Sequence, residues 1–103
     1  MQKEQQIAAE FARSHGLNME PHVRFLDLAS ELGELSKELL KASDYGKDPI
    51  TATADMEEEL GDCIFSLFCL CDSLQLDSEQ ALHRVLEKYR QRIAEREEIG
   101  SGR

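Results

Sequence analysis

The sequence predicts an all-α protein, a four-helix bundle in a single domain spanning residues 1–103. Two observations lead to this fold class. Leu, Ala, Glu, Lys, Arg and Gln dominate the composition, and all of them favour helices. No stretch shows the sustained alternation of apolar and polar residues that is typical of a strand. A chain this short buries a modest fraction of its surface, so a single protomer would have a thin core.

The first two helices are expected in the N-terminal half of the chain. One covers roughly residues 3–14 and ends near Gly16. The next begins near Pro21, a residue suited to the first turn of a helix, and runs to about Ala42. Residues 44–49, with the sequence DYGKDP, read as a turn or short loop.

Two more helices are expected in the C-terminal half. The third runs from about residue 51 to residue 74. The fourth begins after Asp77, which we expect to cap the helix N-terminus, with Gln80 three residues further on. It continues to about Glu98, and residues 99–103 are expected to form a flexible tail.

The third helix is apolar around most of its circumference, which indicates burial on several sides. Its polar residues lie on one thin strip that contains Glu59 and Asp62. Carboxylates on such a helix are costly to bury unless they are paired or bound to a metal. We therefore predict a functional role for these two residues. The apolar surface of the helix is formed by Leu60, Cys63, Ile64, Phe65, Leu67, Phe68, Leu70, Cys71 and Leu74.

A four-residue phrase occurs twice, as residues 31–34 (ELGE) and residues 59–62 (ELGD). In each copy two carboxylates are three residues apart, so they lie on one face of a helix. Antiparallel packing of the second and third helices would bring both acidic edges together, and Mg²⁺ prefers such oxygen ligands. A glycine inside a helix costs about 1 kcal/mol relative to alanine. The matched Gly33 and Gly61 therefore suggest a close approach of two backbones.

The fourth helix carries a basic stripe in which positive residues recur every four positions. Lys88 and Arg92 lie mid-helix beside an apolar stripe, which makes them candidates for phosphate contacts. The alternative, a solvated face with ordinary salt bridges, stays open for this pair and is preferred for Arg84 and Arg96.

Composition limits the classes of partner and the compartment. The net charge of −9 argues against a nucleic-acid polymer or an anionic membrane as partner. The polar N-terminus lacks the apolar core of a signal peptide, and no apolar run is long enough to span a bilayer. Three cysteines without a zinc-binding spacing read as free thiols in a core, which favours the reducing cytoplasm.

With these residues in hand, the chain resembles MazG-type nucleoside triphosphate pyrophosphohydrolases, an all-α superfamily that includes dimeric dUTPases and phosphoribosyl-ATP pyrophosphatase. The resemblance rests on an E-x-x-E … E-x-x-D signature formed by Glu31 and Glu34, then Glu59 and Asp62. Residues 87–92, EKYRQR, resemble the basic K-[FY]-x-x-R element of the family.

The resemblance covers about residues 25–93 and implies a helical bundle completed by homodimerisation, often as a dimer of dimers. It also implies Mg²⁺-dependent hydrolysis of a nucleoside triphosphate to the monophosphate and pyrophosphate, with Mn²⁺ as a substitute ion. A house-cleaning role in the nucleotide pool is the expected physiological setting. Under this resemblance the metal ligands are Glu31, Glu34, Glu59 and Asp62, and the phosphate contacts are Lys88 and Arg92.

Several roles remain open at the level of sequence. Glu38, one turn beyond Glu34, is a candidate further ligand, a base for the attacking water or a surface residue. Phe25 and His22 are candidates for contacts to the nucleotide base. Phe11, Tyr45 and Phe68 are further candidates for the same role, with core packing preferred for the phenylalanines. Many family members carry an Asn before the basic element, where this chain has Leu86 and Glu87, and it has no Trp to stack on a base.

Three alternatives to a broad pyrophosphohydrolase stay open. Two are enzymes with narrow substrate choice, a phosphoribosyl-ATP pyrophosphohydrolase and a dUTPase-like enzyme. The third is a non-catalytic acidic helical module that binds a nucleotide or a protein partner and uses its carboxylates only as surface charge.

Overall fold

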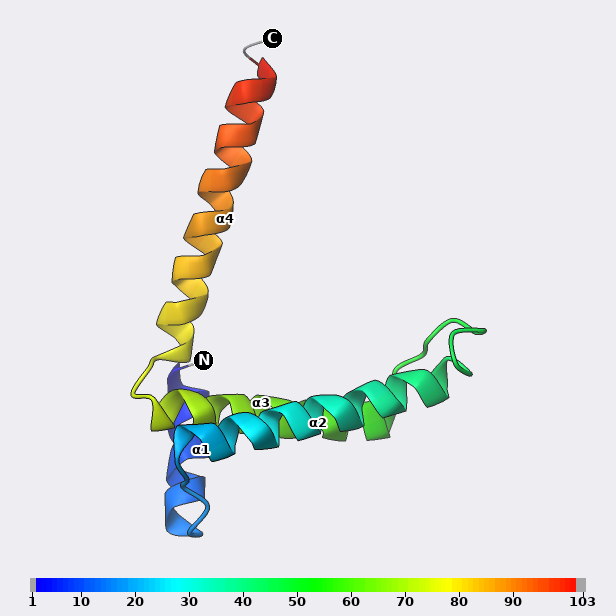
Figure 1. The fold of residues 1–103 in the computed structure, drawn as a ribbon, viewed down its shortest axis with the longest axis vertical. Helices are drawn as coiled ribbons and strands as arrows, with labels where there is room; N and C mark the ends of the chain where they lie inside the picture. Colours follow the sequence, from blue (N-terminus) through cyan, green and yellow to red (C-terminus); the bar gives the residue numbers. More distant parts are fainter. Residues whose placement is uncertain (1, 102–103) are drawn as a thin grey trace.

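A computed structural model describes residues 2–101 of the chain, with side-chain surroundings for residues 2–98. It contains four helices, α1 (Gln2–Ser14), α2 (Pro21–Ala42), α3 (Ala54–Ser73) and α4 (Ser78–Ser101), as Figure 1 shows. Residues 2–101 contain no strand. The all-α prediction is confirmed. None of the helices within these residues is long and apolar enough to cross a membrane.

Helices α2 and α3 form an antiparallel pair, and they lie side by side along most of their length (Figure 1). Pro21 opens α2 in its first turn, as expected from its fixed φ angle. Helix α3 begins three residues later than expected because Thr53 is its N-cap. The Thr53 hydroxyl accepts a hydrogen bond of 3.2 Å from the backbone N–H of Met56.

Helix α1 crosses α3 through small side chains. Ala8, Ala9 and Ala12 are buried on one face of α1. Their lack of bulk lets the two helix backbones approach, and the ring of Phe11 meets the edge of Phe65 at 6.0 Å between centroids. The other buried apolar side chains among residues 2–98 come from α3. They are Met56, Cys63, Phe68 and Cys69.

The cysteines confirm the interpretation from sequence. Cys63 and Cys69 are buried, Cys71 is half-buried, and all three are free thiols. They fill space in the core as small apolar side chains.

Among residues 2–98, Arg24 of α2 is the one buried charged side chain, with 5% of its surface exposed. Its guanidinium donates a hydrogen bond to the carbonyl of Leu17 and lies 3.7 Å from the carboxylate of Asp27. It also lies over the ring of Phe65, 5.9 Å from the centroid. Arg24 therefore ties the α1–α2 connection and α2 to α3.

Helix α4 leaves the other three helices soon after it begins. The Asp77 carboxylate accepts hydrogen bonds from the N–H groups of Glu79 (2.9 Å) and Gln80 (3.1 Å), which confirms its predicted capping role. Gln5 of α1 donates to the Leu76 carbonyl and accepts from the Ser78 N–H, both at 2.8 Å. Beyond this attachment α4 extends away from α2 and α3 (Figure 1).

The position of α4 gives the chain an open shape. Its radius of gyration is 18.0 Å, whereas a closely packed domain of this length has about 13 Å. The expected end of α4 near Glu98 falls inside the helix, which continues to Ser101. Of the expected tail, residues 102–103 lie outside the described part of the chain.

Large apolar side chains on two surfaces are half exposed because no other part of the described chain covers them. One surface is the leucine face of the α2/α3 pair, formed by Leu32, Leu39, Leu60 and Leu67. The other is the apolar stripe of α4, formed by Leu82, Leu86, Tyr89 and Ile93. A single copy therefore does not close a four-helix bundle.

The matched glycines do not mark a close approach of backbones within the chain. A Cβ atom built at Gly33 or Gly61 would meet no atom within 4 Å. The expectation of a close contact is wrong here because both glycines face open surface rather than the interface between α2 and α3.

Candidate metal and nucleotide site

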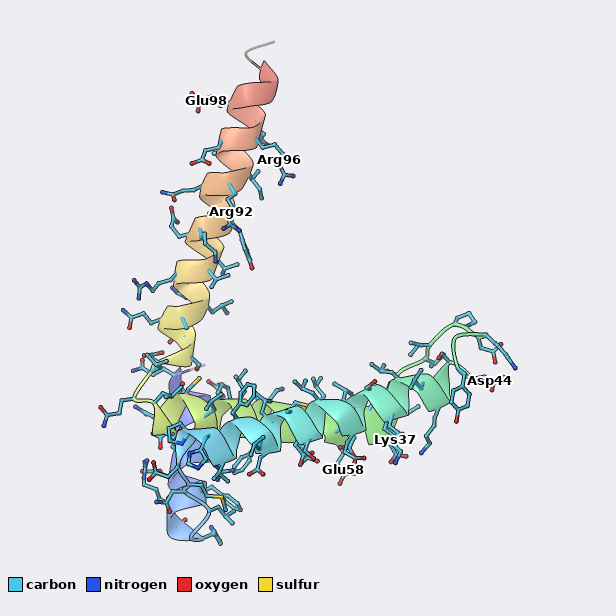
Figure 2. All side chains as sticks on the ribbon, viewed as in Figure 1. Lys37, Asp44, Glu58, Arg92, Arg96 and Glu98 are labelled. Carbon is cyan, nitrogen blue, oxygen red and sulfur yellow. The ribbon has the colours of Figure 1, made fainter. Side chains whose placement is uncertain are left out.

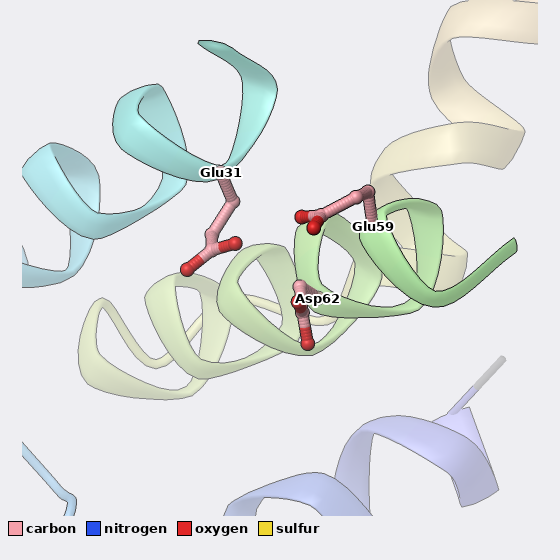
Figure 3. Close-up of side chains that lie close together, drawn as sticks. All are labelled: Glu31, Glu59 and Asp62. Atoms are coloured by element: carbon pink, nitrogen blue, oxygen red, sulfur yellow. The ribbon is translucent and has the colours of Figure 1, made fainter. Parts of the chain in front are cut away.

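Three carboxylates from the two tetrads converge between α2 and α3. Glu31 comes from α2, and Glu59 and Asp62 come from successive turns of α3 (Figure 3). One carboxylate oxygen from each lies within 4.8 Å of the other two. The spacing of three residues places Glu59 and Asp62 on one edge of α3, and the antiparallel register brings Glu31 opposite them.

The cluster is partly sheltered and partly open. Glu31 and Glu59 are half-buried, whereas Asp62 is exposed. In the described part of the chain no lysine or arginine forms an ion pair with any of the three. A ligand from solvent can therefore reach carboxylates that have no positive partner of their own.

Electrostatics disfavour ionising this cluster without a cation. Loss of hydration on burial, then the charges of Asp62, Glu34 and Asp27, raise the pKa of Glu31. Loss of hydration, followed by the charges of Asp62 and Glu31, likewise raises the pKa of Glu59. A hard divalent cation would offset this repulsion, and three carboxylate oxygens are a donor set that suits one. The residues present fit a divalent metal.

Two further predicted residues lie beside the cluster rather than in it. Glu34 is exposed, yet its charge is close enough to raise the pKa of both Glu31 and Glu59. Glu38 is half-buried, its charge raises the pKa of Glu59, and its carboxylate pairs with the Lys41 ammonium at 3.3 Å. Both add negative potential along the same edge of α2.

Sequence reasoning missed two neighbours of the cluster. Asp27 contributes to the raised pKa of Glu31, and its position four residues before Glu31 is the signal that could have found it. Cys63 was assigned only to the core, but burial and then the charges of Glu31, Asp62 and Glu59 raise the pKa of its thiol. The thiol therefore stays protonated next to the acidic cluster.

The structure does not bring the basic pair to this cluster within one chain. Lys88 and Arg92 are both exposed. The Lys88 ammonium lies over the ring of Tyr89, 5.6 Å from the centroid. Figure 2 shows Arg92 on the part of α4 that has already left α2 and α3.

The candidate base contacts are spread over several surfaces. Phe25 is 59% exposed and His22 is exposed, both in the first two turns of α2. Tyr45 is exposed in the α2–α3 loop, and Phe68 is buried in the core, as its packing role predicts. Phe11 is half exposed and stacks on His15 at 4.3 Å. The preference for core packing is wrong for Phe25, because no other part of the described chain covers most of its ring.

Four helices, with an acidic cluster between the second and third, define an all-α domain with a candidate site for a divalent metal. The model of the MazG nucleotide pyrophosphohydrolase domain matches residues 20–96, and the chain therefore belongs to this family. The family resemblance inferred from residues 25–93 is confirmed. The family is one of nucleotide pyrophosphohydrolases, and its members generally use a divalent metal.

The relatives agree with this family assignment. The chain is 44% identical to the uncharacterized protein YpjD of Bacillus subtilis (strain 168) over 72 residues, which make up 67% of this chain and 63% of that protein. The chain thus matches less than two thirds of that relative.

Two crystal structures share the fold. That of YpjD from Bacillus subtilis has a TM-score of 0.71 and 34% identity, and the match covers 86% of this chain and 91% of that one. That of a Bacillus-conserved MazG protein, a nucleotide pyrophosphohydrolase, has a TM-score of 0.70 and 28% identity, covering 84% and 85% of the two chains.

Proposed function

We propose that this protein is a Mg²⁺-dependent nucleoside triphosphate pyrophosphohydrolase, which converts a (deoxy)nucleoside triphosphate and water to the monophosphate and pyrophosphate. The observation that carries the proposal is the convergence of Glu31, Glu59 and Asp62, which come from both halves of the family signature. None of the three has a positive partner among residues 2–98, which favours a cation-binding role over ordinary surface charge.

In this mechanism Glu31, Glu59 and Asp62 would hold Mg²⁺, with Glu34 as a further ligand. The ion, when bound, would neutralise phosphate charge and make the attacking water easier to ionise. The carboxylates fix the position of the triphosphate so that water attacks in line with the departing group. The α–β anhydride bond breaks, and pyrophosphate leaves.

The other predicted residues have supporting roles in the proposal. Lys88 and Arg92 contact phosphate oxygens and balance the charge on the leaving pyrophosphate. Phe25 and His22 are exposed on α2 and contact the nucleotide base. The ion pair of Glu38 with Lys41 favours a surface role for Glu38 over that of a base for the water.

Further parts of the proposal concern assembly and setting. The chain assembles as a homodimer or a dimer of dimers, which the exposed leucine face and the apolar stripe of α4 support. The free thiols favour a cytoplasmic location, and the expected role is house-cleaning of the nucleotide pool.

The test is a panel of standard and modified nucleoside triphosphates incubated with protein and Mg²⁺, followed by identification of the products. Monophosphate plus pyrophosphate is the expected result, and diphosphate plus orthophosphate would refute the class. Turnover of several bases separates a house-cleaning enzyme from a dUTPase-like enzyme or a phosphoribosyl-ATP pyrophosphohydrolase. If no substrate is turned over, a non-catalytic binding module becomes the better interpretation.

Substitution of a carboxylate in the cluster tests whether the measured turnover depends on this site. We expect Glu59→Gln to lower Mg²⁺-dependent turnover by at least about 100-fold, because it removes a charged ligand. Glu57→Gln is the matched control, since Glu57 lies on the same helix but points about 160° away from Glu59. Equal activity of both variants would remove Glu59 from the site. Circular dichroism and melting would establish that each variant folds.

A further inference from the structure

Helices α3 and α4 carry apolar rows with the same spacing. In each row the side chains follow one another after four, three and four residues, the spacing of helices that pack along their length. Within each row they project within about 60° of one another around the helix. The α3 row consists of Leu60 and Leu67 of the leucine face together with Ile64 and Cys71. The α4 row is its apolar stripe.

The two rows match in register if α4 folds back along α3. Such antiparallel packing pairs Leu60 with Ile93, Ile64 with Tyr89, Leu67 with Leu86, and Cys71 with Leu82. All four pairs have the same midpoint in the sequence, between Leu76 and Asp77. This midpoint lies inside the connection between α3, which ends at Ser73, and α4, which begins at Ser78. The rows therefore have the register that a hairpin of α3 and α4 requires.

The connection is long enough for this hairpin. Packed helices lie about 8–10 Å apart between axes, and residues 74–77 span up to about 13 Å when extended. The Leu76 N–H donates to the Cys71 carbonyl at 2.9 Å, and Gln75 has a φ of 57°, so these residues close the end of α3. The backbone after Leu76 then sets the direction of α4 and is the place where a hinge can act.

Few contacts hold α4 in its extended direction. Gln5 of α1 accepts from the Ser78 N–H and donates to the Leu76 carbonyl, and beyond this attachment α4 extends away from α2 and α3 (Figure 1). The Ser78 hydroxyl is buried at this joint and has no hydrogen-bond partner among the described residues, which disfavours the extended arrangement. Release of the Ser78 N–H from Gln5 would free α4 to turn.

A turn of α4 onto α3 would cover apolar surface that the extended chain leaves open. Leu60 is 48% exposed and Ile93 is 53% exposed, and the matched register makes them neighbours. A hollow of about 690 Å³ lies at the same level, where α2 ends and α3 begins, lined by Leu35, Leu39, Met56 and Leu60 among others. The Ile93 side chain would enter this hollow. Removal of these side chains from water favours the folded-back arrangement.

We propose that α4 is a movable arm, which in an isolated chain exchanges between the extended position and a closed position on the leucine face of the same chain. The closed arm completes a four-helix bundle within one copy. Because it covers the leucine face, it competes with the packing of a second copy there, and assembly requires the arm to open. Closure involves no nucleotide or metal, so it does not depend on the proposed catalytic function.

Photo-cross-linking from α4 tests this closure. A p-benzoylphenylalanine in place of Ile93 reacts on illumination with C–H groups that contact it. In the closed arm it should cross-link to residues 56–64 or residues 35–39. Gln91 is the matched control position, because it projects about 160° from Ile93 and should give no product with these residues.

Isotope labels separate closure from contact with a second copy. Chains labelled with ¹⁴N and ¹⁵N are mixed by unfolding and refolding, then illuminated at a dilution at which sedimentation shows monomers. Cross-links confined to light–light and heavy–heavy products support the closed arm. Cross-links found only in light–heavy products, or no cross-link from position 93, overturn the proposal.

Small-angle X-ray scattering of monomers measures closure without a change on α4. The extended chain has a radius of gyration of 18.0 Å, whereas a closed bundle of this length has about 13 Å, so exchange should give an intermediate value. Gln5→Ala removes the acceptor of the Ser78 N–H and should shift the ratio of closed to open chains about fivefold toward the closed form. The mean radius should therefore fall.

Gln6→Ala is the matched control for the scattering experiment, because Gln6 is exposed on the same helix and should leave the radius unchanged. A radius that stays near 18 Å in both the wild type and the Gln5→Ala protein overturns the proposal. A protein that remains dimeric at the lowest measurable concentration also overturns it, since the closed arm then does not compete with a second copy.

Discussion

Helices α2 and α4 are similar in length and both amphipathic, yet only α2 packs along another helix of the same chain. Helix α2 lies along α3 with one face half-buried, and the buried Arg24 holds its start in place. Helix α4 is held by Gln5 at its first turn and leaves the rest of its apolar stripe half exposed. The difference shows that amphipathicity fixes which face of a helix needs a partner, but not whether that partner lies in the same chain.

The largest effect on stability is expected where α2 is anchored. Arg24→Met should lower the free energy of unfolding by about 2–3 kcal/mol, because it leaves the Leu17 carbonyl and Asp27 without their charged donor. Urea unfolding followed by circular dichroism would measure the change. Arg90→Met is the control, since its ion pair with Glu87 on α4 is exposed and contributes little. If both variants lose a similar free energy of unfolding, α2 is anchored no more strongly than α4, and the comparison of the two helices fails.

A substitution on α4 should act on assembly instead. Ile93 is 53% exposed in a single copy, so Ile93→Glu should change the stability of an isolated chain by no more than about 0.5 kcal/mol. If a second copy covers the stripe, the buried charge should convert dimers to monomers in sedimentation experiments. Glu97→Gln, near the same end of α4, is the control for the charge change. If the Ile93→Glu protein assembles like the wild type, no second copy packs on the apolar stripe of α4.

The carboxylates Glu31 and Glu59 should make the metal-free protein more stable to unfolding as the pH falls from neutral, because their pKa values are raised in the folded state. The folded pKa values of Glu31 and Glu59 are raised above the ordinary 4.5 of the unfolded chain. The folded state therefore binds more protons between 4.5 and the raised values. Its stability should rise as the pH falls through that window and be lost as the pH rises.

Melting temperatures between pH 7 and pH 5 in the presence of a chelator would measure this effect. Glu59→Gln should flatten the slope, because it removes one of the two shifted groups. Saturating Mg²⁺ should raise the melting temperature most at pH 7, where the carboxylates are ionised, through preferential binding to the folded state. If the melting temperature decreases as the pH is lowered from 7 to 5, the raised pKa values of Glu31 and Glu59 are contradicted.

The smallest effect concerns the paired glycines. With open space around a Cβ at both positions, Gly33→Ala and Gly61→Ala should each stabilise their helix by up to about 1 kcal/mol. A loss of stability at either position would show that another copy of the chain approaches it closely. Comparison of dilute and concentrated samples separates the two cases, because contact with a second copy depends on concentration.

Much of the local structure was predictable because its causes lie within a few residues. The cap at Asp77 and the first-turn Pro21 set helix starts through contacts that span one turn. The cap of α3 at Thr53 was not predicted because Thr51, two residues earlier, is the same residue type and suits a cap equally well. The supposed close approach at Gly33 and Gly61 was wrong because a shared sequence phrase does not determine which faces of two helices meet.

The sequence by itself determined four helices and placed a carboxylate pair on one edge of α2 and another on α3, since helical spacing is a local property. The tertiary structure decided that Glu31 meets Glu59 and Asp62, because that meeting depends on the antiparallel register of two helices far apart in the chain. It also decided that α4, the helix that carries Lys88 and Arg92, extends away from the α2/α3 pair that carries those carboxylates. The hydrogen bonds of Gln5 hold only the start of α4, and no local pattern encodes the direction in which it continues.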